Sequence, residues 1–477
     1  MITVSFILLV AFLTGISDSA PTSGNSSSTD TSVTTSFIEA LLSTAVPTST
    51  DTSFEETTTA GFISTDPNNV LWNDTSDPSV VTPQRGTLGA PIIGPDNIPV
   101  DLQNPDLFAP PTTDSGLVPN AKWPFALSHN RLQTGGWARQ ENIQVMPIAT
   151  EMAGVDMRLE PGAIRELHWH STAEWAYVLK GSTQITAVDQ DGRNYLATVH
   201  AGDLWYFPPG IPHSLQATGD DEEGSEFLLV FDDGAFSEDS TFLVRRNIDT
   251  STITANHGVK QLTDWLDHVP YEVIQKNFQV SNPDAFAHIP AHELYIFPSA
   301  VPPDDATAPE DPQGTVPDPF SFPLSQINAT QHSGGAVKIV DSTTFTVSTT
   351  IAMAEVTINP GAMRELHWHP TMDEWSFFIE GTGRMTLFAS SGIADTFNYQ
   401  PGDIGYVPAA YGHYVENTGN TTLKYLEIFK SDRFQDISLN QWLALTPPAL
   451  VQAHLNLDNE TISQLSKVKP VVIGPSA

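Results

Sequence analysis

The chain has 477 residues and carries 56 acidic against 20 basic side chains, a formal charge of −36 at pH 7. Such a charge repels nucleic acid and anionic membrane surfaces, so we expect neither as a partner. The absence of cysteine excludes disulfides and thiolate metal sites, and the length, with 40% hydrophobic residues, suits two domains.

The N-terminus is typical of a secreted, extracellular protein. Ile2 to Leu13 form an apolar run too short to span a membrane, and small residues near Ser19 offer a cleavage site. Residues 1–19 are therefore predicted to be a signal peptide. No later run of 18 apolar residues occurs, so we expect no membrane contact. Five sequons agree with an exported glycoprotein: Asn25, Asn73, Asn328, Asn420 and Asn459.

Residues 20–84 form a Ser/Thr-rich segment, since 21 of the 40 residues from 21 to 60 are Ser or Thr. This composition buries too little apolar surface to offset the entropy of ordering, so we predict a disordered, O-glycosylated extension or a propeptide. From about Arg85 to Trp137 the chain is rich in Pro and Gly, which predicts an extended arm laid over a domain, without helix.

Short alternating segments bounded by turn residues then predict a mostly β domain, an antiparallel barrel or jelly roll. The expected strands are 142–146, 152–159, 173–179, 182–188, 194–199, 204–207 and 226–231. Residues 261–269 and 271–278 have helical spacing instead, with Pro270 at the start of the second helix. The Pro-rich stretch 298–323 is interpreted as an inter-domain arm.

The strand pattern returns at 336–340, 344–347, 351–358, 374–379, 383–388, 396–399, 404–407 and 423–428, followed by helical segments at 439–444, 448–455 and 460–466. Asp458 or Asn459 is expected to cap the last helix. His168 and His367 are 199 positions apart, and His213 and His413 are 200 apart. This domain-sized period predicts a duplicated domain, 85–280 and 281–477, and not a solenoid.

Each copy contains a His-x-His pair, a Glu and a third His. Residues i and i+2 of a strand point to the same face, so each His pair projects together. The interval from the pair to the Glu differs by one residue between copies, so a turn separates them. A lone His is usually structural, but a repeated set predicts a metal site in each domain: His168, His170, Glu174 and His213, and His367, His369, Glu374 and His413.

The donor set of three nitrogens and one oxygen leaves two positions of an octahedral ion open. That suits Mn(II) or Fe(II) with substrate and O₂, although ligand type alone leaves Co, Ni and Zn open as well. Arg165 and Arg364 each precede the first His by three residues. A surface position is the simpler interpretation, but the repetition favours an Arg inside the barrel that holds a small dicarboxylate.

At these residues the sequence resembles the cupin family. The two cupin motifs match Gly162 to Gly181 with Gly202 to His213, and Gly361 to Gly381 with Gly402 to His413. The second copy has Ala409-Ala410 where the first has Pro209-Gly210, a departure in a turn and not in a ligand. Two tandem copies with RELHWH resemble the bicupin oxalate decarboxylases, and NIPVDLQNPDLFAPPTTD and LQTGGWARQ resemble the secreted fungal members.

This resemblance implies two jelly-roll barrels, oxalate as substrate, Mn(II) at both sites (two per chain) and a requirement for O₂ as transient electron acceptor. It also implies a catalytic acid in a lid over the first site, here Glu238 in Ser-Glu-Asp-Ser-Thr, where Asp239 replaces the Asn of the bacterial pattern. The matching acid of the second domain is Glu427, 14 residues after His413 on the strand from Tyr425 to Phe429, for which an outward-facing strand position is the simpler interpretation. The acids thus differ, one on a loop and one on a strand, which favours the first site for turnover.

In the implied mechanism Glu238 takes the substrate proton as an electron leaves, the C–C bond breaks to release CO₂, and the same acid returns a proton to give formate. Arg165 polarises the substrate and stabilises its charge. Oxalate oxidase, with the same ligands, would instead release H₂O₂ and two CO₂; the lid acid favours decarboxylation.

A storage-type bicupin is the non-enzymatic alternative, but such proteins tend to lose the ligands. A sugar-binding or isomerase cupin fits the paired Arg less well. The family also implies homo-oligomers, trimers or hexamers, and the apolar helical segments near Trp265 and Trp442 are candidate contacts with a neighbouring subunit.

Overall fold

The computed structural model describes residues 84–85, 88–89, 97–238 and 258–475. The predicted signal peptide, nearly all of the Ser/Thr-rich segment, and the sequons at Asn25 and Asn73 lie outside these ranges, as do Asp239 to Thr241 of the predicted lid. Among the helices of the described ranges, none has the length and hydropathy to cross a membrane. β1 (Gln84–Arg85) pairs antiparallel with β2 (Leu88–Gly89).

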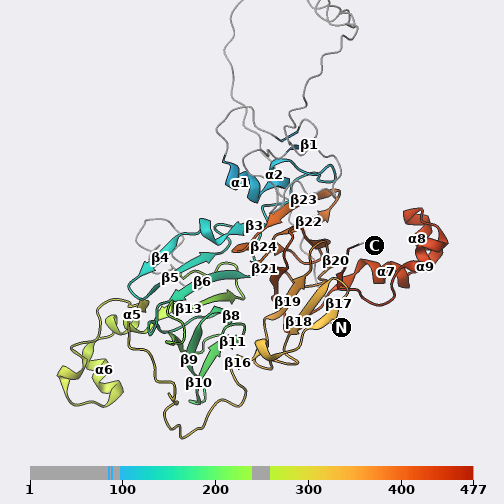
Figure 1. The fold of residues 1–477 in the computed structure, drawn as a ribbon. Coiled ribbons are helices and arrows are strands. Elements are labelled where there is room, and N and C mark those ends of the chain that lie inside the picture. Colours follow the sequence, from blue (N-terminus) through green and yellow to red (C-terminus); the bar gives the residue numbers. More distant parts are fainter. Residues whose placement is uncertain (1–83, 86–87, 90–96, 239–257, 476–477) are drawn as a thin grey trace, which may run out of the picture. The chain divides into compact units, whose positions relative to one another are not determined.

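Two antiparallel sheets form the first barrel (Figure 1). The seven-stranded sheet has the order β16-β11-β8-β13-β6-β5-β4, and the six-stranded sheet has the order β10-β9-β12-β7-β14, with β15 also paired to β7. The strands are β4 (Asn130–Gln133), β5 (Gly136–Glu141), β6 (Ala153–Leu159), β7 (Ile164–Trp169), β8 (Glu174–Lys180), β9 (Ser182–Val188), β10 (Asn194–His200), β11 (Leu204–Phe207), β12 (His213–Ala217), β13 (Ser225–Phe231), β14 (Lys260–Gln261), β15 (Ile296–Phe297) and β16 (Ser321–Phe322).

The second barrel repeats this arrangement. Its sheets have the orders β17-β18-β19-β26-β21-β24-β3 and β23-β22-β25-β20-β27, with β28 also paired to β20. The strands are β3 (Lys122–Pro124), β17 (Thr330–His332), β18 (Gly335–Val340), β19 (Ala352–Ile358), β20 (Met363–Trp368), β21 (Glu374–Glu380), β22 (Gly383–Ser390), β23 (Ile393–Tyr399), β24 (Asp403–Val407), β25 (His413–Asn417), β26 (Leu423–Phe429), β27 (Ile437–Ser438) and β28 (Val472–Ile473). The mostly β, duplicated fold predicted from the sequence is confirmed.

Each motif strand begins after a Pro-Gly turn that only glycine fits well. Gly162 and Gly361 have φ of 78° and 73°, in the left-handed region. A Cβ on Gly162 would lie 2.4 Å from the carbonyl oxygen of Ser299. The turn therefore fixes where β7 starts, and with it the register of the His-x-His pair that β7 delivers.

Short helices flank each barrel between two strands that pair with the same motif strand. Between β14 and β15 lie α5 (Leu262–Asp267), α6 (Tyr271–Phe278) and η3 (Pro283–Phe286). Between β27 and β28 lie α7 (Leu439–Leu445), α8 (Pro448–Leu455) and α9 (Asn459–Gln464). The helices α5 to α9 confirm the predicted helical segments, whereas η3 was not predicted. Asp458 caps α9 by accepting a hydrogen bond from the Thr461 amide.

Three local predictions were wrong. The N-terminal arm contains α1 (Ile98–Gln103) and α2 (Pro105–Phe108), because a proline in the first helical turn is compatible with a helix. Residues 142–146 and 344–347 form turns and not strands. In each case an Asx side chain accepts a backbone N–H two residues on, from Gln144 to Asn142 and from Thr343 to Asp341, which competes with strand pairing.

The two arms are exchanged between the barrels. The segment that precedes the first barrel pairs through β3 with β24 of the second, whereas the segment that precedes the second pairs through β16 with β11 of the first. Short 3₁₀ turns follow both, η2 (Phe125–Leu127) and η4 (Leu324–Gln326). The boundary between 280 and 281 stays a prediction, but strand pairing crosses it in both directions.

One hydrophobic cluster contains residues of both barrels, including Trp175 and Tyr206 of the first and Trp375 and Tyr406 of the second. Buried polar contacts join the same faces. The indole of Trp375 donates to Glu141 at 2.8 Å, and the Tyr177 hydroxyl donates to Glu355 at 2.9 Å. Continuous burial of this kind holds the two barrels in one packed unit.

Candidate metal centres

The structure brings the four predicted ligands of each copy together. His168 lies on β7, Glu174 opens β8 and His213 opens β12, where it pairs directly with His168. The same holds for β20, β21 and β25 in the second barrel. In each cluster one donor atom per residue lies within 4.8 Å of all the others, and every member is buried: His168, His170, Glu174 and His213, and His367, His369, Glu374 and His413.

Backbone carbonyls orient all the imidazole rings. In the first cluster the Nδ1 atoms of His168, His170 and His213 donate to carbonyl oxygens 2.5–2.8 Å away. In the second cluster the corresponding distances for the three His are 2.7–3.0 Å. With Nδ1 carrying the proton, each ring presents the Nε2 lone pair to the centre, which is the tautomer that a metal requires.

The electrostatics favour the neutral state of one His in each cluster and the ionised state of both carboxyls. Burial, assisted by the neighbouring Arg and His, lowers the pKa of His168 and of His367, which keeps these rings neutral. Burial opposes protonation of His369, but its hydrogen bond to Glu374 outweighs burial and raises the pKa of that His. Burial opposes ionisation of Glu174 and Glu374, but the His residues outweigh it, so the pKa of each carboxyl lies below its ordinary value. Nε2 of His367 is buried with no hydrogen-bond partner among the described residues. These residues fit a divalent metal ion with nitrogen and oxygen ligands.

A different side chain orients the ligand carboxylate in each barrel, and the sequence reasoning missed both. The Trp205 indole donates to Oε1 of Glu174 at 2.9 Å. The Ser376 hydroxyl donates to Oε1 of Glu374 at 2.5 Å. Both bonds leave Oε2 as the ligand oxygen, 3.0–3.3 Å from the Nε2 atoms of two His in each cluster.

Arg165 is fully buried beside the first cluster. Its Nη2 donates to Oε2 of Glu238 at 3.0 Å and its Nη1 donates to the Gln261 amide oxygen at 2.8 Å. Its Nε has no hydrogen-bond partner among the described residues. The guanidinium lies over the ring of Tyr295, 4.4 Å from the centroid. Gln261 and Tyr295, neither predicted, thus hold a cation whose hydrogen-bonding capacity is only partly used.

Arg364 is equally buried beside the second cluster, but it meets two carboxylates. Its Nε donates to Glu427 at 3.1 Å and its Nη2 donates to Asp436 at 2.6 Å. Its Nη1 lies 3.5 Å from the carbonyl oxygen of Val471. Burial raises the pKa of Glu427, and Arg364 offsets only part of that effect. Glu427 is therefore an inward-facing strand residue, as the resemblance implied.

The buried Glu of each RELHWH motif is a further residue that sequence reasoning missed. Glu166 accepts from the amide and hydroxyl of Thr263 and from the amides of Leu294 and Tyr295. Glu365 accepts from the Ser438 hydroxyl and the Val471 amide in the same way. These carboxylates attach the flanking helical segments to the motif strands. Repetition of the Glu in both motifs was the available signal.

Glu238 lies at the end of a loop that leaves β13, with its side chain 4% exposed. Its amide donates to the Gln140 side chain at 2.9 Å, and its carbonyl accepts from Arg131 at 3.1 Å. The loop is fastened over His170 by Phe231 and Phe236, whose rings stack 3.5 Å apart and contact the imidazole edge. Glu238 is therefore a buried acid hydrogen-bonded to Arg165.

Comparison with known proteins places this geometry in a family. The family model described as Cupin matches residues 133–264 and 323–463. Oxalate decarboxylase of Bacillus subtilis is 52% identical over 394 residues, which are 82% of this chain and 96% of that protein. A probable oxalate decarboxylase of Arthroderma benhamiae is 40% identical, over 83% of this chain and 96% of that protein. A solved structure of the Bacillus subtilis enzyme, studied for its Mn(II) centres, aligns with a TM-score of 0.75 and 51% identity over 83% of this chain and 99% of its own.

Proposed function

Because this chain belongs to the cupin family, and within it to the bicupin oxalate decarboxylases, we propose that it converts oxalate to formate and CO₂. The observation that carries the proposal is the first site as a unit: a complete ligand cluster, a buried Arg165 and the buried acid Glu238 bonded to that Arg. The reaction balances as hydrogen oxalate giving formate and CO₂, with no net oxidation.

Both clusters are proposed to hold Mn(II), giving two ions per chain. The nitrogen and oxygen donors accept several divalent metals, and the Mn(II) centres of the Bacillus subtilis relative favour manganese. When bound, such an ion supplies Lewis acidity and, with O₂ as the catalytic electron acceptor, one-electron oxidation of oxalate. Metal quantification in the native protein tests the stoichiometry.

Arg165 is proposed to bind one oxalate carboxylate with the donor that the protein leaves unused, and Gln261 and Tyr295 hold its guanidinium in place. Glu238 takes the proton of hydrogen oxalate as the substrate loses one electron. After CO₂ has left, the electron returns from the acceptor and Glu238 returns the proton to carbon, which gives formate. Arg165 stabilises the carboxylate charge throughout. The aromatic pair Phe231 and Phe236 excludes water from the His170 side of the site.

Product analysis tests the function directly. Oxalate is supplied to the full chain loaded with Mn(II), and formate, CO₂ and H₂O₂ are measured together. Decarboxylation predicts equal amounts of formate and CO₂ with little H₂O₂. Equal amounts of H₂O₂ and oxalate consumed, without formate, would instead identify an oxalate oxidase. A storage-type bicupin is disfavoured by the two complete ligand clusters, and absence of both metal and turnover would identify it.

We further propose that the protein is a secreted glycoprotein. The three sequons within the described residues, Asn328, Asn420 and Asn459, lie in surface segments where a glycan can be attached. The N-terminal apolar run supports export. Mass spectrometry of protein from the culture medium, before and after deglycosylation, tests both points, and recovery of the full-length chain inside the cell would contradict export.

The protein is also proposed to assemble into trimers or hexamers. The flanking helices expose large apolar side chains, among them Trp265 (57%) and Trp442 (54%). Exposed apolar side chains on helices that flank a barrel are typical of subunit contacts. Light scattering of the native protein, and of a Trp265→Lys variant, measures the assembly, and an unchanged monomeric mass in both would contradict it.

A further inference from the structure

The two barrels end in equivalent acid loops, which we define as residues 232–238 and 430–436. In each loop the acid follows the last Phe of the closing strand by seven residues, Glu238 after Phe231 and Asp436 after Phe429. A second Phe of each loop contacts the His that follows the motif strand, Phe236 with His170 and Phe434 with His369. The family resemblance matched Glu238 with Glu427, but the structural counterpart of Glu238 is Asp436.

Both acids contact the Arg of their own barrel through the same nitrogen. Nη2 of Arg165 donates to Glu238 at 3.0 Å, and Nη2 of Arg364 donates to Asp436 at 2.6 Å. Each acid therefore lies where a substrate carboxylate would compete with it for the guanidinium. Whether a substrate can displace the acid depends on how firmly the protein holds each carboxylate.

The length of chain that follows each acid differs greatly. Twenty-two residues separate Glu238 from Gln261, the β14 residue that pairs with His168. One residue, Ile437, separates Asp436 from Ser438, which pairs with His367 on β27 and donates its hydroxyl to Glu365. Withdrawing Asp436 therefore requires β27 to leave the motif strand. Glu238 is joined to β14 along the chain only through the longer segment, and beside it Ser237 forms a single parallel bridge with Gly258, two residues before β14.

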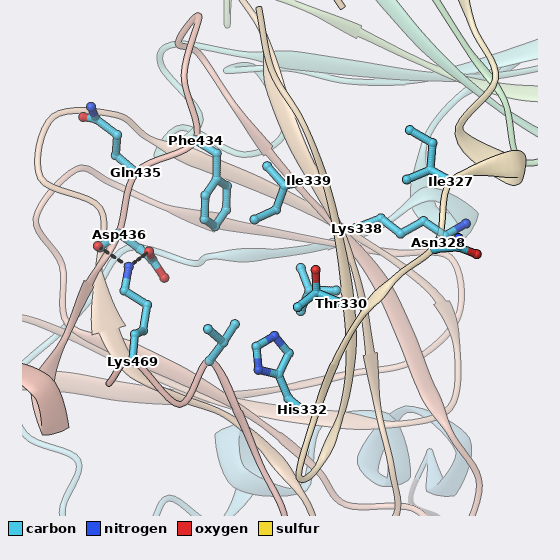
Figure 2. Close-up of a pocket in the computed structure, with 12 residues that line it drawn as sticks. Ile327, Asn328, Thr330, His332, Lys338, Ile339, Phe434, Gln435, Asp436 and Lys469 are labelled. Atoms are coloured by element: carbon cyan, nitrogen blue, oxygen red, sulfur yellow. Dashed lines mark hydrogen bonds and ion pairs between the residues drawn. The ribbon is translucent and has the colours of Figure 1, made fainter. Parts of the chain in front are cut away.

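A lysine holds Asp436 from its other side. Nζ of Lys469 donates to the Asp436 carbonyl at 2.8 Å and forms an ion pair with its Oδ1. Figure 2 shows both contacts at the wall of a pocket of about 680 Å³, where Lys469 is 30% exposed and Asp436 only 2%. Burial opposes ionisation of Asp436, but Arg364 and Lys469 outweigh it and lower its pKa to about 2. The aspartate is thus a fixed anion clamped between two cations.

Arg364 also donates from Nε to Glu427, and its Nη1 lies 3.5 Å from the carbonyl oxygen of Val471, so each of its three nitrogens has an oxygen partner. Arg165 differs, because it faces one carboxylate and the neutral amide of Gln261, and its Nε is unpaired among the described residues. A dianion approaching the second centre would meet two protein carboxylates around the adjacent guanidinium, and repulsion between like charges disfavours its binding.

We propose that Asp436, clamped by Lys469, is a specificity-determining residue that occupies Arg364 as an internal carboxylate and excludes oxalate from the second metal centre. The inference rests on the proposed function in that oxalate is the excluded anion. It assigns the Asp436–Lys469 pair a role of its own: the pair keeps a complete metal site closed to the substrate that the first site accepts.

The test measures binding at the second centre without turnover. The full chain carries Glu174→Ala, which removes a ligand of the first cluster, and is loaded with Mn(II); elemental analysis then gives the ion content. Oxalate is titrated while the Mn(II) electron paramagnetic resonance spectrum is recorded. Asp436→Ala, Asp436→Asn and Lys469→Met are added to this background. Lys430→Met, which breaks an exposed Lys–Glu pair, is the matched control.

The expected result is a spectrum that oxalate does not change in the parent and in Lys430→Met. Asp436→Ala is expected to respond at an oxalate concentration lower by at least about tenfold, since a charged hydrogen bond to Arg364 becomes available. Lys469→Met should respond at intermediate concentrations. If Asp436→Ala loses the metal, Asp436→Asn, which keeps the shape of the side chain, decides the outcome.

Two results would overturn the proposal: a parent that binds oxalate as tightly as the Asp436 variants, or Asp436 variants with full metal content that still do not respond. Formate production by the wild-type protein is measured in parallel. A wild type without formate production contradicts the proposed function alone, because the binding results at the second centre do not depend on turnover.

Discussion

The two metal centres share their ligands and their fold but differ in how the adjacent Arg is used. Arg165 donates one hydrogen bond to the carboxylate of Glu238 and one to the amide of Gln261, and its Nε is unpaired among the described residues. Arg364 meets two carboxylates and a backbone carbonyl. Duplication thus preserved the metal-binding chemistry while the surroundings changed the charge offered to a substrate, and the first centre is the one that suits a dianion.

The largest difference between the two centres is expected when one metal ligand of each cluster is removed in turn. Glu174→Ala is expected to lower formate production roughly 1,000-fold, since metal activation contributes several kcal/mol to a barrier. Glu374→Ala should leave formate production within roughly tenfold of wild type. Formate assays with metal quantification check both, and each variant should retain one Mn(II) per chain. Equal losses in the two variants would show that the centres act together.

The next largest effect is expected at the acids. Glu238→Gln should lower formate production about 100-fold, because proton transfer by a placed side chain contributes at least that much. The share of H₂O₂ among the products should rise, since the proton that completes formate is missing. Glu427→Gln changes the acid that the family resemblance pairs with Glu238 and should cost a few-fold at most. A rate of formate production that depends on Glu427 and not on Glu238 would show that the reaction takes place in the second barrel.

The features that the two centres share could be predicted from the sequence, because ligand spacing and strand alternation are local. All eight ligands, both Arg residues and the duplicated β fold follow from a repeat of one motif. The role of Asp436 could not be read in the same way, since the acid lies on a loop whose two copies share little beyond two Phe residues, in FDDGAFSE and FKSDRFQD. Its significance comes from Lys469, 33 residues further on, which only the fold brings into contact.

The pairing of each arm with the other barrel could likewise not be predicted from local sequence patterns. Proline content predicted an arm but not which barrel it covers, because that choice depends on long-range pairs such as Asp106 with Arg384. Helices α1 and α2 were missed for a related reason. Both are short, and α2 is stabilised by the contact of its Asp106 with Arg384 and Asn398 of the second barrel.

The two arms allow a comparison of how much one carboxylate on each arm contributes to the free energy of unfolding. Asp106 is fully buried and holds Arg384 at 3.1 Å, so Asp106→Ala leaves a buried guanidinium without its carboxylate and should cost about 3 kcal/mol. Asp311, on the other arm, is half-buried and accepts the Asn194 amide at 2.8 Å, so Asp311→Ala should cost about 1 kcal/mol. Urea unfolding of the full chain measures both. Similar losses would mean that the buried ion pair contributes no more than a neutral hydrogen bond.

The smallest effect concerns the contact between the barrels, which is also asymmetric. Glu141 ends β5 and accepts the Trp375 indole, whereas the residue that ends the equivalent strand β18 is Val340. Burial raises the pKa of Glu141 to about 8, above the ordinary 4.5. Between these pH values the folded protein holds a proton that the unfolded chain has released. The stabilisation is therefore complete below pH 4.5 and is lost as the pH rises through 8.

Glu141→Gln keeps an acceptor for the indole but cannot ionise, so it should remove this pH dependence. The variant should match wild type near pH 4 and exceed its unfolding free energy by about 2 kcal/mol at about pH 8, within the upper bound of roughly 5 kcal/mol that the pKa difference sets. Thermal melts at both pH values measure this, with Glu151→Gln, an exposed carboxylate at the same contact, as the control. The same pH dependence in wild type and in the Glu141→Gln variant would show that Glu141 ionises in the folded protein as easily as in water.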